Sequence, residues 1–276
     1  MRLEIIPASE TFGATAIGVD LRTEPALETV AAIREAWLCH QVLSFPGQSL
    51  SLEEFERFAA TIGAFGHDPY FHNLPGHPHI AEVRRDADEA TPIFAETWHS
   101  DWSFLATPPS ATLLFGVVVP PVGGDTLFAN QYAAWETLPA ETRALLNGKI
   151  GIHSARRGYA PGGLYGANDK GRSMAIRYSE DAMATCLHPI VRRHPETGKD
   201  TLFVNPGYTI GIDGMPEDEA TSLLAELFDH QTREEFIYRH RWSADMVVIW
   251  DNRCLLHAAT GGYDGYARLL HRITVA

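Results

Sequence analysis

The segment Ala111-Thr112-Leu113-Leu114-Phe115-Gly116-Val117-Val118-Val119 is an apolar run rich in β-branched side chains. A run of this length and composition favours a buried β-strand. Further strands are predicted at 41–47, where Pro46-Gly47 signals a turn, and in the closing segments 246–251 and 267–275. Many short strands with few helices outside them predict a mainly β protein of the double-sheet jelly-roll type.

Helical spacing of apolar residues marks the segments that should flank these strands. Residues 28–40 show it, and residues 51–62 begin with a capping box in which Glu54 follows Ser51 by three positions. Two shorter helices are predicted at 139–146 and 223–229.

The chain contains no repeat and no linker that would separate domains, so we expect a single domain over residues 1–276. Residues 67–97 form a long polar stretch broken by four prolines, which predicts a mobile lid. The glycine-rich segment 161–171 follows no clear strand and opens no helix, so it predicts a loop and not a phosphate-binding motif.

Charge and cysteine content narrow the classes of partner. Thirty-five acidic against twenty-two basic residues give a formal net charge of −13, which disfavours binding to nucleic acid or to an anionic membrane surface. The three cysteines are too few and too widely spaced for a disulfide framework, and the first residues lack the apolar stretch of a signal peptide. We expect a cytoplasmic homo-oligomer that acts on a small molecule.

His99-Ser100-Asp101 and the distant His257 form the most specific chemical pattern in the chain. In an extended segment, residues two apart project from the same face, so His99 and Asp101 can bind one ion together. His257 is the best candidate for the third ligand. Two histidines and one carboxylate leave half of an octahedron open, as in the facial triad of non-heme Fe(II) oxygenases.

Arg268 and Arg272 are separated by an even number of positions in the closing strand, so their side chains should share one face. Two guanidinium groups on one face could bind carboxylates or sulfonates. His271 alternates to the other face, which favours a structural role for it, and His194 lies beside the turn signal Pro195-Glu196-Thr197-Gly198.

A set of motifs in a fixed order resembles the taurine dioxygenase and 2,4-dichlorophenoxyacetate dioxygenase family. The resemblance runs from about the first strand to the C-terminus and is carried by Trp98-His99-Ser100-Asp101, Pro108-Pro109, Gly123-Gly124-Asp125-Thr126-Leu127, Leu187-His188-Pro189, His194-Pro195-Glu196-Thr197-Gly198, Phe203-Val204-Asn205, Trp250-Asp251-Asn252-Arg253 and His271-Arg272-Ile273-Thr274. It implies a double-stranded β-helix, which is a distorted jelly roll, with Fe(II) in its mouth and 2-oxoglutarate and O2 as cosubstrates.

The resemblance also implies roles for single residues. Arg268 and Thr126 would bind the distal carboxylate of 2-oxoglutarate, and the reaction would hydroxylate a substrate while releasing succinate and CO2. Trp98 and Trp250 lie next to metal ligands, where they could limit access of water, and Asn252 could orient the loop that bears His257.

The expected substrate is a small organic anion whose acidic group pairs with Arg272: a sulfonate such as taurine or an alkylsulfonate, an alkyl sulfate, or an aryloxyalkanoate. Taurine dioxygenases carry an asparagine where this chain has Ala95, which favours an apolar or aromatic tail over an ammonium group. Tyr159 and Tyr208 match family positions that line the substrate cavity. Two candidates from the lid are His67 and Tyr70.

Two other classes are compatible with the metal pattern alone. A Zn²⁺ hydrolase could use the same two histidines and carboxylate to activate water. A non-catalytic binding protein could also hold a metal on a jelly-roll scaffold, although structural sites are normally closed by four protein ligands.

Overall fold

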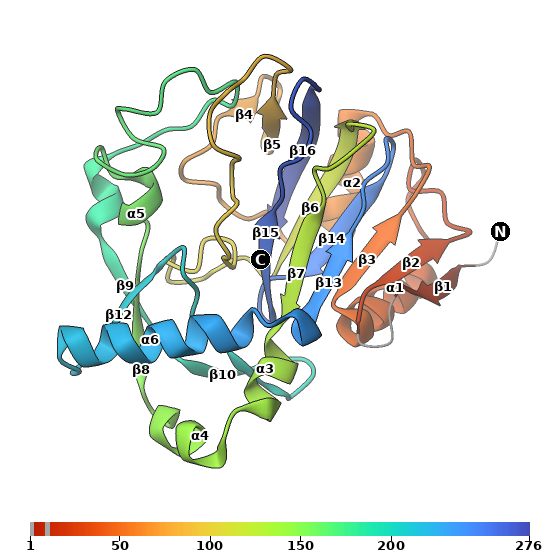
Figure 1. Cartoon of the computed structure of the whole chain (residues 1–276). Helices are drawn as coiled ribbons and strands as arrows, with labels where there is room; N and C mark the ends of the chain where they lie inside the picture. The colour runs from red at the N-terminus through yellow and green to blue at the C-terminus, as the bar shows by residue number, and fades with distance from the viewer. Residues whose placement is uncertain (1–2, 9–11) are drawn as a thin grey trace.

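The computed structural model describes residues 3–8 and 12–276, and strands dominate it (Figure 1). Within these residues the largest sheet is eight-stranded and mostly antiparallel, with one parallel pair between β2 and β3. In order across the sheet, its strands are β1 (Glu4–Pro7), β2 (Ala14–Ile17), β3 (Val42–Phe45), β14 (Val247–Asp251), β6 (Ala111–Val118), β16 (Arg268–Val275), β5 (His77–Arg85) and β4 (Asn73–Leu74).

Smaller antiparallel sheets complete the β structure among the described residues. They are β13 (Ile237–His240), β7 (Thr126–Asn130) and β15 (Leu255–Ala259); then β12 (Thr209–Ile212), β8 (Ile150–Ser154) and β9 (Thr185–Pro189); then the pair β10 (Val191–Arg193) and β11 (Asp200–Leu202). The helices are α1 (Leu27–His40), α2 (Leu52–Ile62), α3 (Gln131–Thr137), α4 (Ala140–Leu146), α5 (Arg156–Tyr159) and α6 (Glu217–Gln231), with 3-10 turns at Glu180–Met183 and Glu234–Phe236.

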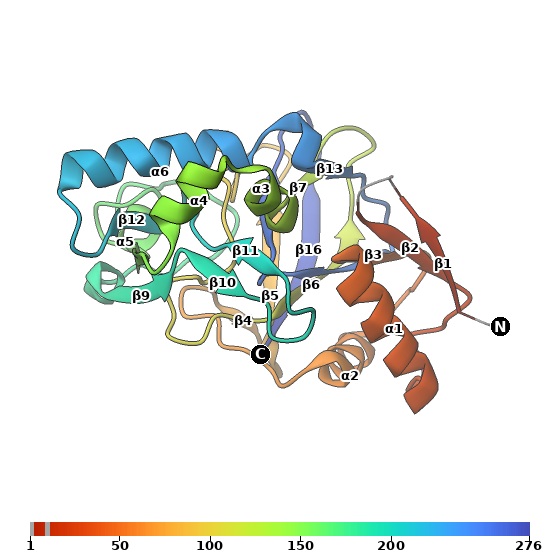
Figure 2. The same ribbon diagram turned by 90° about the horizontal axis from the view of Figure 1, so that it is seen from below.

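The central strands of the large sheet, β3, β14, β6 and β16, are buried on both faces, as their continuous apolar character requires. In β14, Val247 and Ile249 pack into the core beneath α1 and α2, whereas Val248 and Trp250 pack toward the small sheet β13-β7-β15. Figure 2 shows α1 and α2 on one side of the molecule and α3, α4 and α6 on another. The large sheet and the small sheet β13-β7-β15 therefore enclose a core between them.

The helix α2 shows how local sequence signals fix an element. The Ser51 hydroxyl accepts a hydrogen bond from the Glu54 backbone N–H at 3.3 Å, and the Glu54 carboxylate accepts one from the Ser51 N–H at 2.8 Å. The predicted capping box is therefore confirmed. Phe55 and Phe58 are fully buried on the inner face of the helix, which attaches it to the sheet.

Most predicted elements are confirmed with small changes of boundary. The four predicted strands became β3, β6, β14 and β16, residues 161–171 contain neither helix nor strand, and 28–40 and 139–146 are helical within one residue of the predicted ends. The helix predicted at 223–229 is too short, because α6 spans Glu217–Gln231. Apolar spacing alone missed residues 217–222, where three acidic residues follow Pro216 and favour a helix N-terminus.

The prediction of a continuous lid over residues 67–97 is wrong in its middle. Residues His77–Arg85 form β5, which pairs with β16 in the large sheet from Ala81↔Arg272 to Arg85↔Arg268. Pro78 is tolerated because it lies before the part of β5 that pairs with β16. The motion of the flanking segments 67–76 and 86–97 stays a prediction.

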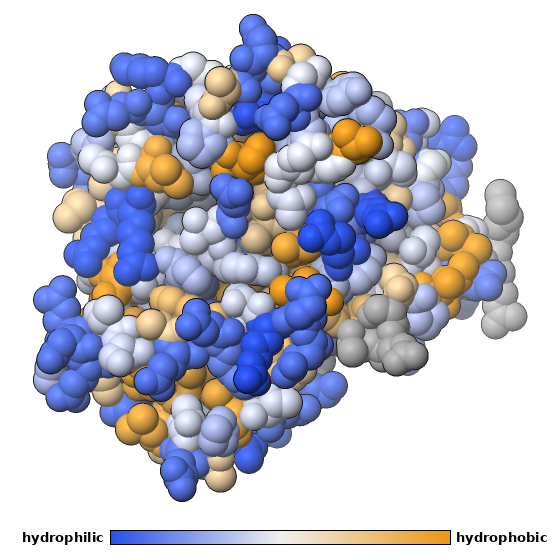
Figure 3. Space-filling view, in the orientation of Figure 1, coloured by the Kyte–Doolittle hydropathy of each residue, from blue (hydrophilic) through white to orange (hydrophobic). Residues whose placement is uncertain are grey.

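Polar side chains cover most of the face seen in Figure 3, with hydrophobic side chains in scattered small groups. This distribution agrees with the strongly acidic composition. In the described part of the chain, no helix combines the length and the apolar character that crossing a membrane requires.

Candidate metal centre and active site

A short backbone bridge places the two predicted metal-binding histidines side by side. The His99 N–H donates to the His257 carbonyl at 3.0 Å, and the His257 N–H donates to the His99 carbonyl at 2.8 Å. His257 lies within β15, so this bridge attaches the loop bearing His99 to the edge of the small sheet. The centroids of the two imidazole rings are 4.2 Å apart.

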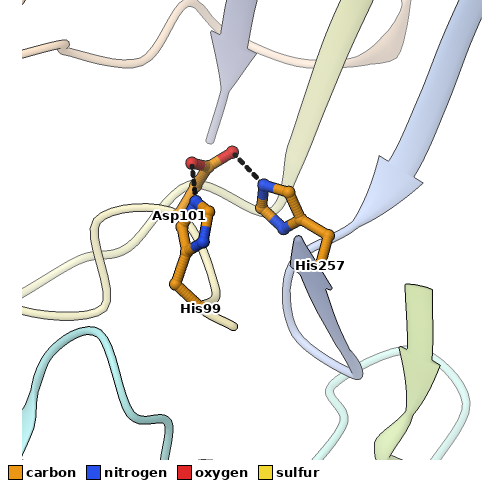
Figure 4. A group of neighbouring side chains, drawn as sticks. All are labelled: His99, Asp101 and His257. Carbon is orange, nitrogen blue, oxygen red and sulfur yellow. Dashed lines mark ion pairs between the residues drawn. The ribbon is translucent and has the colours of Figure 1, made fainter. Parts of the chain in front are cut away.

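Asp101 faces both rings, as Figure 4 shows. Its Oδ1 lies 3.7 Å from His99 Nε2, and its Oδ2 lies 3.8 Å from His257 Nε2. The candidate ligand atoms of the three residues all lie within 4.8 Å of one another, and all three side chains are buried. The structure thus brings His257 next to His99 and Asp101, from which it is separated by more than 150 positions in the sequence.

The protonation of the two imidazoles suits metal binding. His99 Nδ1 lies 2.8 Å from the Thr97 carbonyl, to which it donates as an N–H, so Nε2 keeps its lone pair. Burial lowers the pKa of His99, and burial together with the neighbouring His99 lowers the pKa of His257 to about 3. Both rings are therefore neutral at physiological pH, which is the form that binds a metal ion.

A chain of hydrogen bonds through Thr112, Asn252 and Trp250 orients the Asp101 carboxylate. The Thr112 hydroxyl donates to Asp101 Oδ2 at 2.5 Å and accepts from Asn252 Nδ2 at 2.9 Å, and Asn252 Oδ1 accepts from Trp250 Nε1 at 2.9 Å. Asn252 was expected to have an orienting role, but the sequence reasoning missed Thr112. The sequence did offer a sign of Thr112, which is a hydroxyl residue in an otherwise apolar strand, and the structure buries it.

Arg272 lies between two carboxylates. Its Nη1 donates to Asp68 Oδ1 at 2.5 Å, and its Nη2 lies 3.1 Å from Asp101 Oδ1. The guanidinium carbon of Arg272 lies 5.0 Å from the ring centroid of Phe71 and 5.0 Å from that of Trp102. Burial by itself would lower the pKa of Arg272, but Asp101 and Asp68 raise it above the usual arginine value. The charge of this predicted substrate ligand is already balanced within the protein.

Asp68 is the second residue that the sequence reasoning missed. It is buried, and its Oδ1 accepts hydrogen bonds from Arg272, from the Trp102 indole N–H, and from the Thr274 hydroxyl at 3.3 Å. Three donors from different parts of the chain thus hold this carboxylate in place. Local sequence gave no sign of it, because the donors meet Asp68 only in the folded chain.

Arg268 has surroundings of the opposite kind. It is buried, yet no carboxylate of the described residues lies within ion-pair distance, and its Nε has no hydrogen-bond partner there. Its Nη2 donates to the Gly124 carbonyl at 3.2 Å. Burial lowers the pKa of this guanidinium. A buried cation without a counter-charge is costly unless a ligand supplies one.

The hydroxyl of Thr126 points into the same space. The Trp242 indole N–H donates to Thr126 Oγ1 at 3.0 Å, and the Arg268 guanidinium carbon lies 5.9 Å from the Trp242 ring. Since the hydroxyl oxygen accepts from the indole, its own hydrogen is free to donate to a bound carboxylate. Trp242 is a third contributor to this site that sequence reasoning missed.

The two glycines before Asp125 permit this arrangement. Gly123 and Gly124 have φ values of +66° and +67°, in the region that favours glycine. A Cβ at Gly123 would lie 2.5 Å from the Gly262 carbonyl oxygen, and one at Gly124 would lie 3.3 Å from Arg268 Nε. Side chains at these positions would therefore displace the turn or the arginine.

Two adjoining cavities open on this centre. The first, here called the metal cavity, has a volume of ≈ 60 Å³ and is lined by the three candidate ligands together with Thr126, Arg268 and Arg272. The second, here called the aromatic cavity, has a volume of ≈ 130 Å³, and its lining includes Phe94, Arg157, Tyr159, Leu164, Tyr165 and Tyr208. His99 lines both cavities, so a molecule in the aromatic cavity would reach the metal centre.

The remaining predicted substrate residues divide into two groups. Tyr159, Tyr208 and Ala95 line both cavities, as expected from their positions. Tyr70 stacks on Tyr159 with a centroid distance of 4.4 Å but lines neither cavity. His67 is exposed and is not brought to the site, because the chain turns Asp68 inward and leaves its neighbour facing solvent.

The histidines predicted to be structural have structural partners. His194 Nε2 lies 3.0 Å from Asp251 Oδ2, while its Nδ1 accepts the backbone N–H groups of Glu196 and Thr197 at 3.2 and 3.1 Å. His271 lies on the opposite face of β16 from Arg268 and Arg272, with its Nε2 3.9 Å from Glu82 Oε1. Neither lines the two cavities.

Comparison with known proteins identifies the class to which this fold and site belong. Residues 4–274 match the family described as "Taurine catabolism dioxygenase TauD, TfdA family". The chain therefore belongs to this family. It is an alpha-ketoglutarate-dependent dioxygenase with the double-stranded β-helix fold, and it works with Fe(II), 2-oxoglutarate and O2.

Individual relatives have different named substrates. The (S)-phenoxypropionate/alpha-ketoglutarate-dioxygenase of Delftia acidovorans is 35% identical, covering 93% of this chain and 89% of the relative. The alpha-ketoglutarate-dependent sulfate ester dioxygenase of Pseudomonas putida is 32% identical, covering 100% and 90%. A crystal structure of a taurine dioxygenase from Burkholderia xenovorans superposes with a TM-score of 0.81 at 34% identity, covering 99% and 89%.

Family membership favours the dioxygenase over the zinc hydrolase and the non-catalytic metal protein. The local chemistry fits the family cofactors as well. Two neutral imidazoles and one carboxylate are the donor set of a facial Fe(II) site. The unpaired Arg268 Nε and the Thr126 hydroxyl offer what the distal carboxylate of 2-oxoglutarate requires.

Proposed function

We propose that this chain hydroxylates a small organic acid with an aromatic body, an aryloxyalkanoate in preference to taurine. The observation that supports this most directly is the aromatic cavity beside His99, whose walls include Phe94, Tyr159, Tyr165 and Tyr208. Its volume of ≈ 130 Å³ is on the scale of one aromatic ring, since engineered apolar cavities of about 150 Å³ bind benzene.

Relatives support the same class. One acts on phenoxypropionate and another on 2,4-dichlorophenoxyacetate according to their names. Ala95 lines both cavities and carries no polar group that could bind an ammonium, which is consistent with the preference against taurine. Alkylsulfonates and alkyl sulfates share the acidic group without the ring, so they are the competing substrates within the proposed class.

Each part of the site has a proposed task. His99, Asp101 and His257 hold Fe(II), and Arg268 with Thr126 binds the distal carboxylate of 2-oxoglutarate. When bound, the metal and the cosubstrates supply the oxidation, which releases succinate and CO2 and adds a hydroxyl to the substrate. Thr112 and Arg272 hold the Asp101 carboxylate in one orientation, from opposite sides. Tyr159 and Tyr208 fix the substrate ring close to His99 and exclude water.

Hydroxylation at the carbon beside an aryl ether oxygen gives an adduct that breaks down to a phenol. The protein needs only to place that carbon next to the metal centre. We also propose that the enzyme works in the cytoplasm as a homo-oligomer, with no nucleic acid or membrane partner, as predicted from its composition.

The test is the stimulation of succinate formation by candidate substrates. Purified protein with Fe(II) and 2-oxoglutarate would be supplied with taurine, unsubstituted alkylsulfonates, alkyl sulfates and phenoxyalkanoates in parallel. The proposal expects the highest kcat/KM for a phenoxyalkanoate, together with release of the phenol. Taurine giving much the highest kcat/KM, or neutral aromatic ethers outperforming every acid, would contradict it. Replacing Fe(II) by Zn²⁺ should abolish succinate formation.

A further inference from the structure

The glycine-rich segment 161–171, which the sequence predicts to be a loop, brings Tyr165 to the site. Tyr165 is buried and lines the aromatic cavity, with its ring centroid 5.0 Å from that of Phe94. The Tyr165 backbone N–H donates to the Gly158 carbonyl at 2.8 Å. A Cβ at Gly163 would lie 2.8 Å from the same carbonyl oxygen, so the loop is packed too closely for a side chain there. This packing fixes the place of the tyrosine.

The Tyr165 hydroxyl meets a residue with an unusual backbone conformation. Its oxygen accepts a hydrogen bond from the Ala95 N–H at 3.1 Å. Ala95 has a φ of +61°, in the left-handed region that residues with a Cβ rarely adopt. The Ala95 carbonyl accepts from the N–H of Ala259, in the same strand as His257, at 2.9 Å. Such a conformation persists only where its surroundings enforce it, and here a hydrogen bond on each side of the residue does so.

Ala95 lies where the two cavities meet. It lines both the metal cavity and the aromatic cavity, as His99 does. A shift of the Ala95 backbone would therefore change the wall that the space for the substrate ring shares with the metal centre. Hydroxylation requires the reacting carbon to be placed within a small distance of that centre, so this wall matters for the reaction.

Buried charges hold the two loops together around this contact. The Glu89 carboxylate, from segment 86–97, accepts from the Ser173 N–H at 2.8 Å and from the Ser173 hydroxyl at 2.5 Å. It also lies 3.7 Å from Arg172 Nη1, and both of these side chains are buried. The Arg172 guanidinium carbon lies 5.2 Å from the centroid of the Tyr165 ring. The segment that bears Ala95 is thus attached to the loop that bears Tyr165.

We infer that Tyr165 is a positioning residue for the reaction. Its hydroxyl keeps Ala95 in the left-handed conformation, and Ala95 in turn sets how closely the substrate ring approaches the metal centre. This inference rests on the proposed function, in which the ring occupies the aromatic cavity. Loss of the hydroxyl alone would keep the aromatic walls but release the Ala95 backbone, so that 2-oxoglutarate would be consumed without hydroxylation of the substrate.

Hydrogen exchange in the metal-free, full-length protein tests the contact without any substrate. Tyr165→Phe keeps the ring and removes the hydroxyl, so the protection of the Ala95 amide, resolved by NMR, should fall by about 5-fold, as expected for one neutral hydrogen bond. Tyr178→Phe is the matched control, because Tyr178 is 47% exposed and lines neither cavity. It should leave the protection of Ala95 unchanged. Unchanged protection in Tyr165→Phe would overturn the assignment.

The ratio of products tests the positioning itself. With Fe(II), 2-oxoglutarate and O2, hydroxylation of phenoxyacetate beside the ether oxygen gives phenol and glyoxylate, together with one succinate and one CO2. The wild type and Tyr178→Phe should form close to one phenol per succinate. In Tyr165→Phe this ratio should fall by about 2-fold or more, because the reacting carbon is misplaced. Adding Ala95→Gly should restore part of the ratio, since glycine adopts a positive φ without a steric cost.

The outcomes separate this inference from the proposed function. A wild-type ratio in Tyr165→Phe would overturn the positioning role and leave the substrate class intact. A lowered ratio that Ala95→Gly does not improve would show that Tyr165 acts by a route other than Ala95, which also contradicts the inference. If the wild type forms no phenol from any phenoxyalkanoate, the proposed function fails, and hydrogen exchange at Ala95 then decides whether Tyr165 holds that residue.

Discussion

Two arginines line the metal cavity, and their surroundings differ. Both side chains come from β16, four positions apart, and both are buried. Arg268 meets a backbone carbonyl and a tryptophan ring but no carboxylate among the described residues. Arg272 meets two carboxylates. The strand presents the same chemical group twice, and only the neighbours distinguish the two positions.

The difference separates a place for a ligand from a part of the scaffold. At Arg268 the counter-charge must come from outside the protein, and we propose that the distal carboxylate of 2-oxoglutarate provides it. At Arg272 the counter-charge is built in, so the guanidinium orients Asp101 and joins it to Asp68. A buried charge that lacks a partner is thus the stronger indication of a binding site.

The largest expected effect follows from removing the carboxylate of Asp101, which we propose to bind Fe(II) and which also lies against Arg272. Asp101→Ala should lose Fe(II) binding and reduce succinate formation below detection, and His99→Ala or His257→Ala should do the same. Equilibrium dialysis with Fe(II) measures the binding, and circular dichroism checks that the fold remains. Near-normal turnover by a natively folded Asp101→Ala protein would show that the metal site is elsewhere.

Arg268→Gln tests the arginine that lacks a counter-charge. Loss of a charge-assisted contact should cost about 2–4 kcal/mol of 2-oxoglutarate binding, which is roughly 30- to 1000-fold in affinity. Lysine should restore only part of it, because a point charge does not match the carboxylate. Titration of the Fe(II) chelate absorption gives the affinity for 2-oxoglutarate. An unchanged affinity in Arg268→Gln would show that Arg268 does not bind the cosubstrate.

His153 and His240 test whether every unpartnered buried atom indicates a ligand. Each has a buried Nε2 without a partner among the described residues, yet neither lines a site cavity. Burial, with the neighbouring His188, lowers the pKa of His153 to about 3, and burial lowers that of His240 to about 4. These rings avoid an unpaired charge by staying neutral, an option that arginine does not have.

The sign of the resulting pH dependence is fixed. Below an unfolded-state pKa of about 6.5, the unfolded chain binds protons that the native chain does not. The free energy of unfolding should therefore fall on acidification from about pH 6.5, by about 1.4 kcal/mol per pH unit for each histidine until its native pKa is reached. Urea denaturation of metal-free protein between pH 7.5 and 5.5 measures this, and His153→Gln should reduce the slope. Identical slopes would argue against a neutral His153.

The smallest expected effect concerns the support of Thr126. Trp242→Phe keeps an aromatic ring near Arg268 but removes the N–H that orients the threonine hydroxyl, which should weaken 2-oxoglutarate binding by about 1 kcal/mol, or roughly 5-fold. In Thr126→Val protein, the same tryptophan substitution should have little further effect. Additive losses in the double variant would indicate that Trp242 acts independently of Thr126.

Local signals in the sequence determined most of the elements and pointed to the candidate metal-binding residues. Strand composition, the capping box at Ser51 and turn residues act over a few positions, so they can be recognised without knowing the fold. The spacing of His99 and Asp101, and the even separation of Arg268 and Arg272, likewise follow from strand periodicity. The lid was overestimated because prolines near the start of β5 resembled those of a loop.

Only the tertiary structure decided which charges are free. Asp68 and Arg272 are 204 positions apart, and no local pattern indicates that they meet. The same holds for Trp242 with Thr126, and for Arg157 with the backbone carbonyls of Pro206 and Thr209. Sequence periodicity specifies the face on which a side chain lies, but the sign and number of charges opposite it depend on which distant segments pack there. For this chain, the sequence determined the chemistry of the site, and the packing decided where a ligand can bind.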